Sequence, residues 1–444
     1  MRILCTADIH IGRASSRIPD DLGGDHSSVS AWKRIVDLAI EERVDLVAVA
    51  GDIIDAAANY FHSSGPLQAG LERLSREGIH AVMIAGNHDH DSLKRFFEQF
   101  GSRGNVNCTH FLGSTRGWER RDIQLSSGKK LQLVGRSFGS AHQTSDPFDD
   151  KLPEFDEDGS TILGLLHADV DQVRSRYAAC ASARLMDSRP DIWLLGHIHS
   201  HKPFPNPAVA INKHIFYPGS PQSLDPGESG SHGVWILEIS TGLITKSYHQ
   251  LSSVYYEKLD IDIGGMMENG DPAAAVERRI RERLGEITNQ PAPPRVVGFR
   301  VRLIGRTALH SALLLNGGKL LGDIDEFRPV MEGVQGFLEG DVTIDTRPAI
   351  DLLRLSAGKS PAALLAKLIL RIESGEKDEF LESAGKRLSD AFQSMGIDGD
   401  SGGEGHEDQT PPDSRDQLLS ESYRLLAELE EGRNNDLYGG ALRT

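Results

Sequence analysis

Five short segments of the sequence each end an apolar run with residue types that bind divalent metal ions. The segments are TADIH, GDIID, GNHDH, LLHAD and GHIHSH. The candidate ligands that they supply are Asp8, His10, Asp52, Asn87, His167, His197 and His199. Carboxylate, amide and imidazole groups in this combination suit two divalent cations that share one carboxylate. If the five segments converge, the sequence predicts a centre for phosphoester hydrolysis.

Hydrolysis of a phosphodiester needs an activated water, positive charge near the phosphoryl oxygens and a proton for the leaving oxygen. Two cations about 3.5 to 4 Å apart supply the first two requirements. Asp52 is the candidate bridging ligand, because it follows a buried apolar run and a glycine that permits a tight turn. We assign one cation to Asp52 with Asp8, His10 and His199, and the other to Asp52 with Asn87, His167 and His197.

One histidine of GNHDH, His88, is not needed as a ligand and is the candidate general acid. Its imidazole could reach the leaving oxygen, and Asp89 could accept its other N–H and fix the tautomer. Asp55 has two equally good interpretations, as a support for a ligand or as a helix N-cap. Weaker candidates, for contact with substrate phosphate, are His201, Arg116, Arg120 and Arg121. For these arginines a solvated surface position is the more common alternative.

Each ligand segment follows directly on a short apolar run, which is typical of a strand buried on both faces. The runs cover residues 3–6, 46–50, 81–84, 162–166 and 192–195. Between them, residues 29–42 and 66–77 carry apolar residues at helical spacing, with Ser28 as a plausible N-cap. Ligands in open α/β sheets gather outside the carboxyl ends of the strands, so five pieces of chain can meet in one crevice. The predicted fold class is therefore α/β.

The length of 444 residues predicts more than one domain. We predict five parts: a catalytic domain at residues 1–253, a small α+β module at 254–346, a helical region at 347–395, a flexible acidic linker at 396–415 and a C-terminal amphipathic helix at 416–444. The apolar stripe of the last helix has two interpretations. It packs on its own domain, or it docks on a partner protein across the linker.

The formal net charge of −17 argues against binding of nucleic acid through a bulk positive field. It does not exclude nucleic acid, because bound cations would offset part of the charge and a sum hides a basic patch. Three widely spaced cysteines fit a reduced cytosolic chain. No apolar run approaches the ~18 residues of a membrane span, and the apolar start is too short for a signal peptide. We therefore expect a cytoplasmic protein without membrane association.

The motifs Asp-x-His, Gly-Asp, Gly-Asn-His-Asp, a lone His and Gly-His-x-His occur in this order over about residues 1–251. They resemble the calcineurin-like metallophosphoesterase superfamily. Within it, MRILCTADIHIG, YPGSPQSLDPGE and VRLIGRTALH resemble the SbcD and YhaO type of bacterial DNA repair exonuclease. The resemblance implies a four-layer α/β/β/α sandwich that is followed by a small capping domain and a helical C-terminal arm.

The same resemblance implies function and partners. It implies two manganese ions, 3′ to 5′ exonuclease activity with some endonuclease activity on DNA, and a role in DNA repair or defence. It also implies an SMC-like coiled-coil ATPase partner of the SbcC or YhaN type, and it is compatible with a homodimer. One alternative is a phosphoesterase for small nucleotide or cyclic nucleotide substrates, because the same metal centre serves many substrates. Another is a non-catalytic scaffold, which predicts a broken ligand set that this sequence does not show.

Overall fold

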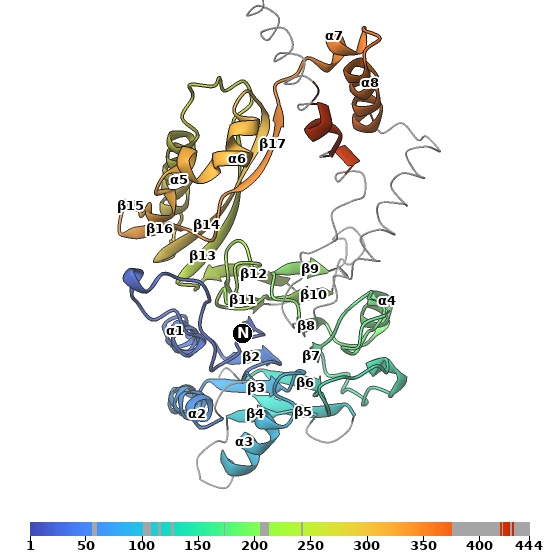
Figure 1. Cartoon of the computed structure of the whole chain (residues 1–444). Helices are drawn as coiled ribbons and strands as arrows, with labels where there is room; N and C mark the ends of the chain where they lie inside the picture. The colour runs from blue at the N-terminus through green and yellow to red at the C-terminus, as the bar shows by residue number, and fades with distance from the viewer. Residues whose placement is uncertain are drawn as a thin grey trace, which may run out of the picture. The chain divides into compact units, whose positions relative to one another are not determined.

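The chain folds into two compact units (Figure 1). The computed structural model describes residues 1–55, 60–100, 108–113, 117–125, 128–172, 174–204, 213–240, 243–374, 418–419, 421–426 and 429. The first unit comprises Met1–Glu257, Arg283–Phe299 and Arg328–Glu339, and the second comprises Lys258–Glu282, Arg300–Phe327 and Gly340–Thr444. The first unit therefore includes stretches beyond residue 253, where the sequence places the end of the catalytic domain.

A six-stranded sheet carries the first three ligand segments of the chain. Its strands are β1 (Arg2–Thr6), β2 (Leu46–Ala50), β3 (His80–Ile84), β4 (Thr109–Phe111), β11 (Gly233–Ser240) and β12 (Leu243–Gln250). Their order is β12-β11-β1-β2-β3-β4. The strands β1 to β4 are mutually parallel, with Ile3 opposite Leu46, whereas β11 runs antiparallel to β1. The carboxyl ends of β1, β2 and β3 therefore lie along one edge.

A second six-stranded sheet carries the other two ligand segments. Its strands are β5 (Glu119–Gln124), β6 (Lys130–Arg136), β7 (Thr161–His167), β8 (Ile192–Gly196), β9 (Lys202–Phe204) and β10 (His214–Tyr217), in the order β5-β6-β7-β8-β10-β9. Parallel pairing joins β6, β7, β8 and β10. The strands predicted before the five ligand segments all form, and each end lies within one residue of the prediction.

The two sheets pack face to face, and helices cover their outer faces (Figure 1). The shared core contains Ile3 and Val82 of the first sheet and Leu163 of the second. The helices on the first sheet are α1 (Ser28–Glu41), α2 (Tyr60–Arg76) and α3 (Ser92–Phe100), and α4 (Ser182–Asp187) lies on the second. Apolar residues alternate along β1, with Leu4 facing the helices and Ile3 facing the other sheet, which is the period of a strand. The predicted α/β class is confirmed.

A third sheet follows in the chain. It contains β13 (Val254–Asp262), β14 (Val296–Thr307), β15 (Val330–Met331), β16 (Val334–Leu338) and β17 (Thr343–Pro348). The remaining elements are α5 (Pro272–Thr288), α6 (His310–Leu321), α7 (Leu352–Ser356), α8 (Pro361–Glu373) and the 3-10 turns η1 (Asp20–Leu22), η2 (Pro147–Asp149) and η3 (Ile324–Glu326). Strands β13 to β16 and helices α5 and α6 lie within residues 254–346, where the sequence predicts a small α+β module.

The apolar stripe near the C-terminus packs inside the second unit. Leu419, Tyr423 and Leu426 are buried against Ala366 and Ile369 of α8. The Tyr423 hydroxyl donates a hydrogen bond to Glu373, with 2.6 Å between the oxygens. Leu419, Tyr423 and Leu426 therefore pack on their own unit, whereas Leu425 and Leu429 of the same stripe are exposed. The predicted linker at 396–415 lies outside the described residues.

None of the helices in the described part of the chain combines the length and the apolar composition needed to cross a lipid bilayer. Cys5 and Cys180 are buried free thiols, and Cys108 is a half-buried free thiol. Burial explains the first two as small apolar core residues.

The imidazole of His26 is buried in the first unit, and its burial predicts a pH dependence of stability. Its ring hydrogen-bonds to the Gly23 carbonyl oxygen at 2.8 Å and to the Ser253 hydroxyl at 3.0 Å. Burial lowers the pKa of His26 below its ordinary value of 6.5. The unfolded chain therefore binds the proton more readily, so this contribution to stability is lost as pH falls below 6.5 toward the folded-state pKa.

We expect the free energy of unfolding to fall less in His26→Gln than in the wild type when the pH is lowered from about 7 to about 5. Urea titrations followed by circular dichroism measure this free energy. His62→Gln is the matched control, because His62 is an exposed histidine of the same unit. An identical pH dependence in His26→Gln and wild type would contradict the expectation.

Candidate metal centre

The predicted ligands meet at the edge where the strands of both sheets end. Asp8 and His10 follow β1, Asp52 follows β2 and Asn87 follows β3. His167 ends β7, and His197 and His199 follow β8. Asp8, His10, Asp52 and His167 are at most 2% exposed. Asp8 and His167, which are 159 positions apart in the sequence, thus share one buried region, and the convergence on which the sequence prediction depends is present in the fold.

The backbone at the ligand residues is unusual for side-chain-bearing residues. Asp8, His10 and Asp52 have φ angles of 52°, 50° and 51°. This left-handed region is uncommon outside glycine and tends to occur at functional sites. Backbone hydrogen bonds stabilise it: the Asp8 N–H donates to Gly51 at 3.1 Å, and the His10 N–H donates to Asp52 at 2.9 Å. The loops after β1 and β2 therefore hold one another in a conformation that turns both carboxylates into the crevice.

Two motif glycines permit the close approach of the strand ends. A Cβ atom on Gly86 would lie 2.2 Å from Oδ1 of Asp52, and one on Gly196 would lie 1.9 Å from the carbonyl oxygen of Ala50. Both distances are shorter than van der Waals contact, so any side chain would push the segments apart. The glycines of GNHDH and GHIHSH are therefore part of the geometry of the centre.

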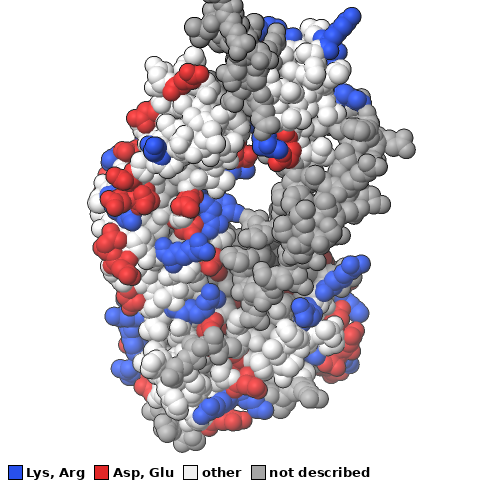
Figure 2. Space-filling view, in the orientation of Figure 1, with Lys and Arg blue, Asp and Glu red and all other residues white. Residues whose placement is uncertain are grey.

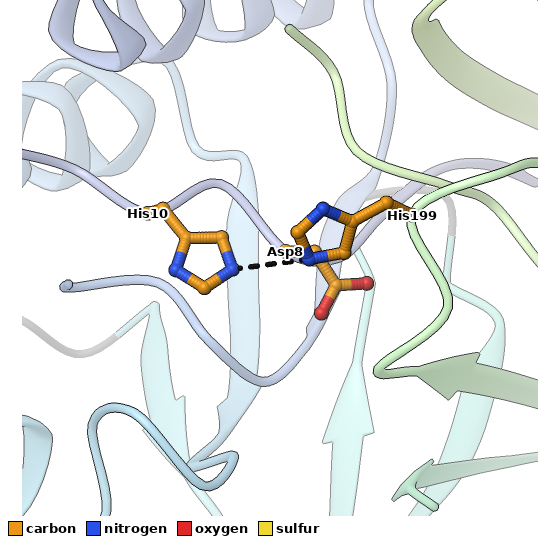
Figure 3. A group of neighbouring side chains, drawn as sticks. All are labelled: Asp8, His10 and His199. Carbon is orange, nitrogen blue, oxygen red and sulfur yellow. Dashed lines mark hydrogen bonds between the residues drawn. The ribbon is translucent and has the colours of Figure 1, made fainter. Parts of the chain in front are cut away.

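Asp8, His10 and His199 form one group of potential ligands (Figure 3). One ligand atom of each lies within 4.8 Å of the others, and Nε2 of His10 lies 3.3 Å from Nε2 of His199. Figure 3 shows the two imidazoles turned toward one another, with the Asp8 carboxylate beside His199. Ser28 supports this group. It was predicted as an N-cap, but Ser27 caps α1, and the Ser28 hydroxyl donates to the His10 carbonyl oxygen at 2.7 Å.

Asp8, Asp52 and His167 form a second group. Nε2 of His167 lies 3.3 Å from Oδ2 of Asp52 and 3.1 Å from Oδ1 of Asn87. The opposite nitrogen, Nδ1, donates to the carbonyl oxygen of Ala50 at 2.9 Å, which orients the ring. Although burial alone would lower it, the Asp52 and Asp8 carboxylates raise the pKa of His167 to about 9. Nε2 of His167, Oδ2 of Asp52 and Oδ1 of Asn87 therefore converge in a region of negative potential that the two carboxylates create.

Asp52 borders both groups. Its Oδ2 atom lies 3.3 Å from Nε2 of His167 and 3.9 Å from Nε2 of His10. Its other oxygen, Oδ1, accepts the backbone N–H of His88 at 2.9 Å. Asp8 is the residue that both groups share, whereas Asp52 belongs to the second group and lies near His10 of the first, so the bridging role of Asp52 stays a prediction.

The donor set fits divalent cations. Carboxylates as buried as Asp8 and Asp52 are unfavourable unless positive charge compensates them. Carboxylate oxygens, an amide oxygen and imidazole nitrogens are ligands that first-row divalent metals accept. A buried nitrogen, Nδ1 of His10, makes no hydrogen bond and lies 3.3 Å from the Asp55 carboxylate. The described residues could therefore hold two such ions.

His197 lies beside the second group, and its ring is positioned by the Asp169 carboxylate. Its Nε2 atom lies 3.4 Å from the Asp169 carboxylate, and its ring centroid is 5.3 Å from that of His167. Its backbone N–H donates to Asp8 at 3.0 Å. The groups of three ligands found among the described residues do not include it. Because Asp169 engages Nε2, the nitrogen left for a metal is Nδ1.

His88 lies at the centre, but the carboxylate of its predicted partner Asp89 binds backbone groups instead. Oδ1 and Oδ2 of Asp89 accept the backbone N–H groups of Gly86 and Ile53, both at 2.7 Å. The prediction that Asp89 fixes the tautomer of His88 is wrong, because this buried carboxylate satisfies two backbone donors. The carboxylate beside His88 is Asp55, at 3.9 Å from its Nδ1 atom. Asp89 therefore ties the loop after β3 to the loop after β2.

Asp55 lies between the two histidines and contacts both. Its Oδ2 atom is 3.3 Å from Nδ1 of His10 and 3.9 Å from Nδ1 of His88. The two rings meet edge to face, with 4.8 Å between centroids. Of the two interpretations of Asp55, support of a ligand agrees with these contacts. His10, Asp55 and His88 also form a third group of potential ligand atoms, so metal content has to be measured when His88 is replaced.

The predicted substrate contacts are engaged elsewhere. The exposed His201 ring contacts Tyr248 in a tilted arrangement, with 4.9 Å between centroids and an interplanar angle of 34°. Arg120 pairs with Asp122 at 2.7 Å and with Asp156 at 2.9 Å, and Arg121 pairs with Glu119 at 3.3 Å. Both arginines lie on β5, at the far edge of the second sheet from β8. The structure does not bring these three residues to the ligand set, and Arg116 lies outside the described residues.

Sequence reasoning did not assign two further carboxylates, Glu228 and Asp169. Glu228 lies in the YPGSPQSLDPGE segment, where only family resemblance drew attention to it. Its Oε1 atom lies 2.5 Å from Nδ1 of His199, and its Oε2 atom accepts the Leu224 N–H at 2.7 Å. Although burial alone would raise it, the neighbouring His199 lowers the pKa of Glu228 to about 2. Its carboxylate therefore orients His199 so that Nε2 faces Asp8 and His10.

We expect Glu228→Gln to weaken metal binding by about 10- to 100-fold, the usual effect of losing a carboxylate that orients a ligand histidine. Isothermal titration with Mn²⁺ measures the affinity. Asp225→Asn is the matched control, because Asp225 lies in the same loop and its contacts are with Ser16 and Gly227. An unchanged affinity in Glu228→Gln would show that His199 does not depend on this carboxylate.

Comparison with known proteins places this geometry in context. Residues 1–201 match the calcineurin-like phosphoesterase family, and residues 256–346 match the middle domain of metallophosphoesterase YhaO. YhaO of Bacillus subtilis, described as an uncharacterized metallophosphoesterase, is 25% identical over 266 residues, which are 58% of this chain and 62% of that protein.

Two further relatives are described as a DNA repair protein and as a subunit of a nuclease. The DNA double-strand break repair protein Mre11 of Haloferax volcanii is 24% identical over 408 residues, or 88% of this chain and 82% of that protein. The SbcD component of the nuclease SbcCD of Escherichia coli K12 is 32% identical over 92 residues, or 20% of this chain and 21% of that protein. The matches to YhaO and to SbcD therefore span less than two thirds of those proteins.

Proposed function

The chain carries a calcineurin-like metallophosphoesterase domain followed by a YhaO-type middle domain, and on this premise we propose that it is a metal-dependent DNA exonuclease that acts in DNA repair or defence. The metallophosphoesterases are hydrolases, and the chain's resemblance to this family is confirmed by the matches above. The observation that carries the proposal is the convergence of Asp8, Asp52, Asn87 and His167 from four strand ends.

We assign Asp8, His10 and His199 to one cation, Asn87, His167 and His197 to the other, and Asp52 to both. The two divalent ions, for which we propose manganese, would activate water and offset charge on the phosphoryl oxygens when bound. The chain's own part is to hold the ligand atoms in place. Hydrogen bonds from His167 to Ala50 and between His199 and Glu228 fix the ring orientations before any ion arrives.

His88 is the proposed general acid for the leaving sugar oxygen. Its side chain is 29% exposed, so it can reach substrate, whereas its neighbour Asp89 is fully buried. The Asp55 carboxylate lies 3.9 Å from Nδ1 of His88, on the side of the ring where it can orient the imidazole. The edge-to-face contact with His10 limits the rotation of the His88 ring. These contacts support a proton donor at the rim of the ligand set.

DNA is the proposed substrate because two relatives are described as a DNA repair protein and a component of a nuclease. The net charge of −17 does not oppose this choice, since adjacent basic side chains gather locally on the face drawn in Figure 2, among acidic ones. The alternative, a small nucleotide or cyclic nucleotide, uses the same centre and is favoured by no contact of the described residues.

A side-by-side assay with manganese tests the proposal. Its substrates are 5′-labelled single-stranded DNA, duplex ends, a cyclic nucleotide and bis-para-nitrophenyl phosphate. We expect a ladder of progressively shortened labelled DNA, as a 3′ to 5′ exonuclease produces, and its absence in Asp52→Asn. Turnover of the cyclic nucleotide without DNA degradation would instead support the alternative.

We further propose that the helices of the second unit bind a coiled-coil ATPase of the SMC type. Leu419, Tyr423 and Leu426 are buried within the unit, but Leu353 of α7 and Leu364 of α8 are 74% and 61% exposed. Apolar side chains presented by helices can pack on a partner helix. Replacement of both by Glu should abolish co-purification with such an ATPase, whereas Leu314→Glu with Leu315→Glu on α6 should not. Equal co-purification in both double variants would refute this docking face.

A further inference from the structure

A second pair of histidines faces each other at the amino ends of β3 and β4, the opposite end of the first sheet from the metal centre. Nδ1 of His80 lies 3.2 Å from Nε2 of His110. The rings are nearly parallel, with an interplanar angle of 12° and centroids 5.5 Å apart. Two imidazole nitrogens on one tetrahedral zinc ion, with bonds of about 2.0 to 2.1 Å, are separated by roughly 3.3 Å. The pair is therefore spaced as two ligands of one ion.

A thiol shares the face that carries this pair. The parallel register places Ala81 opposite Thr109 and Val82 opposite His110, and the Ala81 N–H donates to the Cys108 carbonyl oxygen at 2.7 Å. Continued by one position, this register puts His80 opposite Cys108. Because side chains two residues apart share a face, Cys108, His110 and His80 lie on the same face of the sheet. Cys108 is free and half-buried.

The surroundings keep both imidazoles ready to bind a cation. Burial lowers the pKa of His110 to about 4 and lowers that of His80 below its ordinary range, so both rings are neutral near pH 7. His80 also hydrogen-bonds to the backbone of Gln124 and lies near Asp45, and both favour positive charge at its ring. The positive charge of Arg121 instead lowers the pKa of His110.

We propose that His80 and His110, with Cys108 as a third ligand, bind a zinc ion at a site separate from the catalytic centre. Imidazole and thiolate ligands favour Zn²⁺, whereas the carboxylate-rich catalytic set also suits Mn²⁺. Among the described residues, the groups of three ligand atoms within 4.8 Å of one another do not include Cys108, so the proposal requires its Sγ atom to move toward the two imidazoles when the ion binds. The ion would fasten the three-residue edge strand β4 to β3.

The test compares the zinc retained by the full chain after incubation with Zn²⁺ and desalting, measured by mass spectrometry of the metal. Wild type should retain one equivalent more than His110→Gln. His214→Gln is the matched control, because His214 is a half-buried strand histidine of the same unit and should retain the wild-type amount. Hydrolysis of bis-para-nitrophenyl phosphate with manganese should be unchanged in His110→Gln. Equal zinc retention by wild type and His110→Gln would overturn the proposal.

A second experiment, in a variant that lacks two histidines of the catalytic centre, tests whether the zinc is bound outside that centre. In His167→Ala with His199→Ala, which removes two imidazoles of that centre, adding His80→Gln should again remove one equivalent of zinc. Circular dichroism checks that each variant folds. Loss of the same equivalent from both backgrounds supports the zinc site, and no loss in the second background excludes it. Neither outcome depends on whether the substrate is DNA.

Discussion

His88→Ala should reduce hydrolysis of DNA by about 10²-fold or more, the usual contribution of a general acid, while the content of bound metal stays unchanged. The reason is that a sugar alkoxide leaves slowly unless it is protonated. A para-nitrophenolate leaves readily without a proton. We therefore expect a much smaller loss with bis-para-nitrophenyl phosphate as the substrate. The ratio of the two turnover numbers, measured with manganese at saturation, is the diagnostic quantity.

The matched control for this prediction is His201→Ala, which removes an exposed histidine whose ring contacts Tyr248. It should leave both turnover numbers close to the wild type. Because His88 also belongs to a group of potential ligands with His10 and Asp55, metal content decides between two roles. Loss of bound metal in His88→Ala, with equal losses on both substrates, would identify His88 as a ligand and remove it as the general acid.

Asp52→Asn should abolish hydrolysis of both substrates and weaken the binding of both metal ions. The expected loss of affinity exceeds the roughly 10- to 100-fold that follows loss of an orienting partner, because Asp52 borders both ligand groups itself. The neutral amide cannot supply the charge that a shared ligand provides. Metal titration and turnover measure the effect.

Stability gives an independent measure of the same change. Ions that bind only the folded state raise the melting temperature as their concentration increases. Mn²⁺ should therefore stabilise the wild type and have little effect on Asp52→Asn. Asp37→Asn, which removes a surface carboxylate paired with Arg73 on α2, serves as the control and should respond like the wild type. A full manganese response in Asp52→Asn would refute the bridging role.

Prediction from the sequence worked well where one local pattern decided the outcome. Short apolar runs followed by a metal-ligand residue predicted β1, β2, β3, β7 and β8 to within one residue at each end. A strand buried on both faces has few alternatives in sequence, and the carboxyl ends of parallel strands meet at one edge for topological reasons. The set of Asp8, His10, Asp52 and His167 could therefore be assembled before the fold was known.

Side-chain partners were harder to predict, because they depend on where a carboxylate turns after its strand ends. Adjacency in sequence suggested that Asp89 would hold His88, but Asp89 turns inward to two backbone N–H groups and Asp55 lies beside His88. Glu228 is 29 residues from His199, and no local pattern links the two. A buried carboxylate goes to the donors that would otherwise remain unsatisfied, and only the packed fold identifies those donors.

The sequence alone determined the fold class, the residue types of the metal centre and the strand ends that supply them, because these follow from hydrophobic period and motif order. The tertiary structure decided how the ligands are oriented, through Ala50, Asp169 and Glu228. It also decided that Leu419, Tyr423 and Leu426 of the C-terminal stripe pack on α8 and that His80 faces His110. Contacts between distant segments depend on the register of strands and the packing of layers, which no single stretch of sequence encodes.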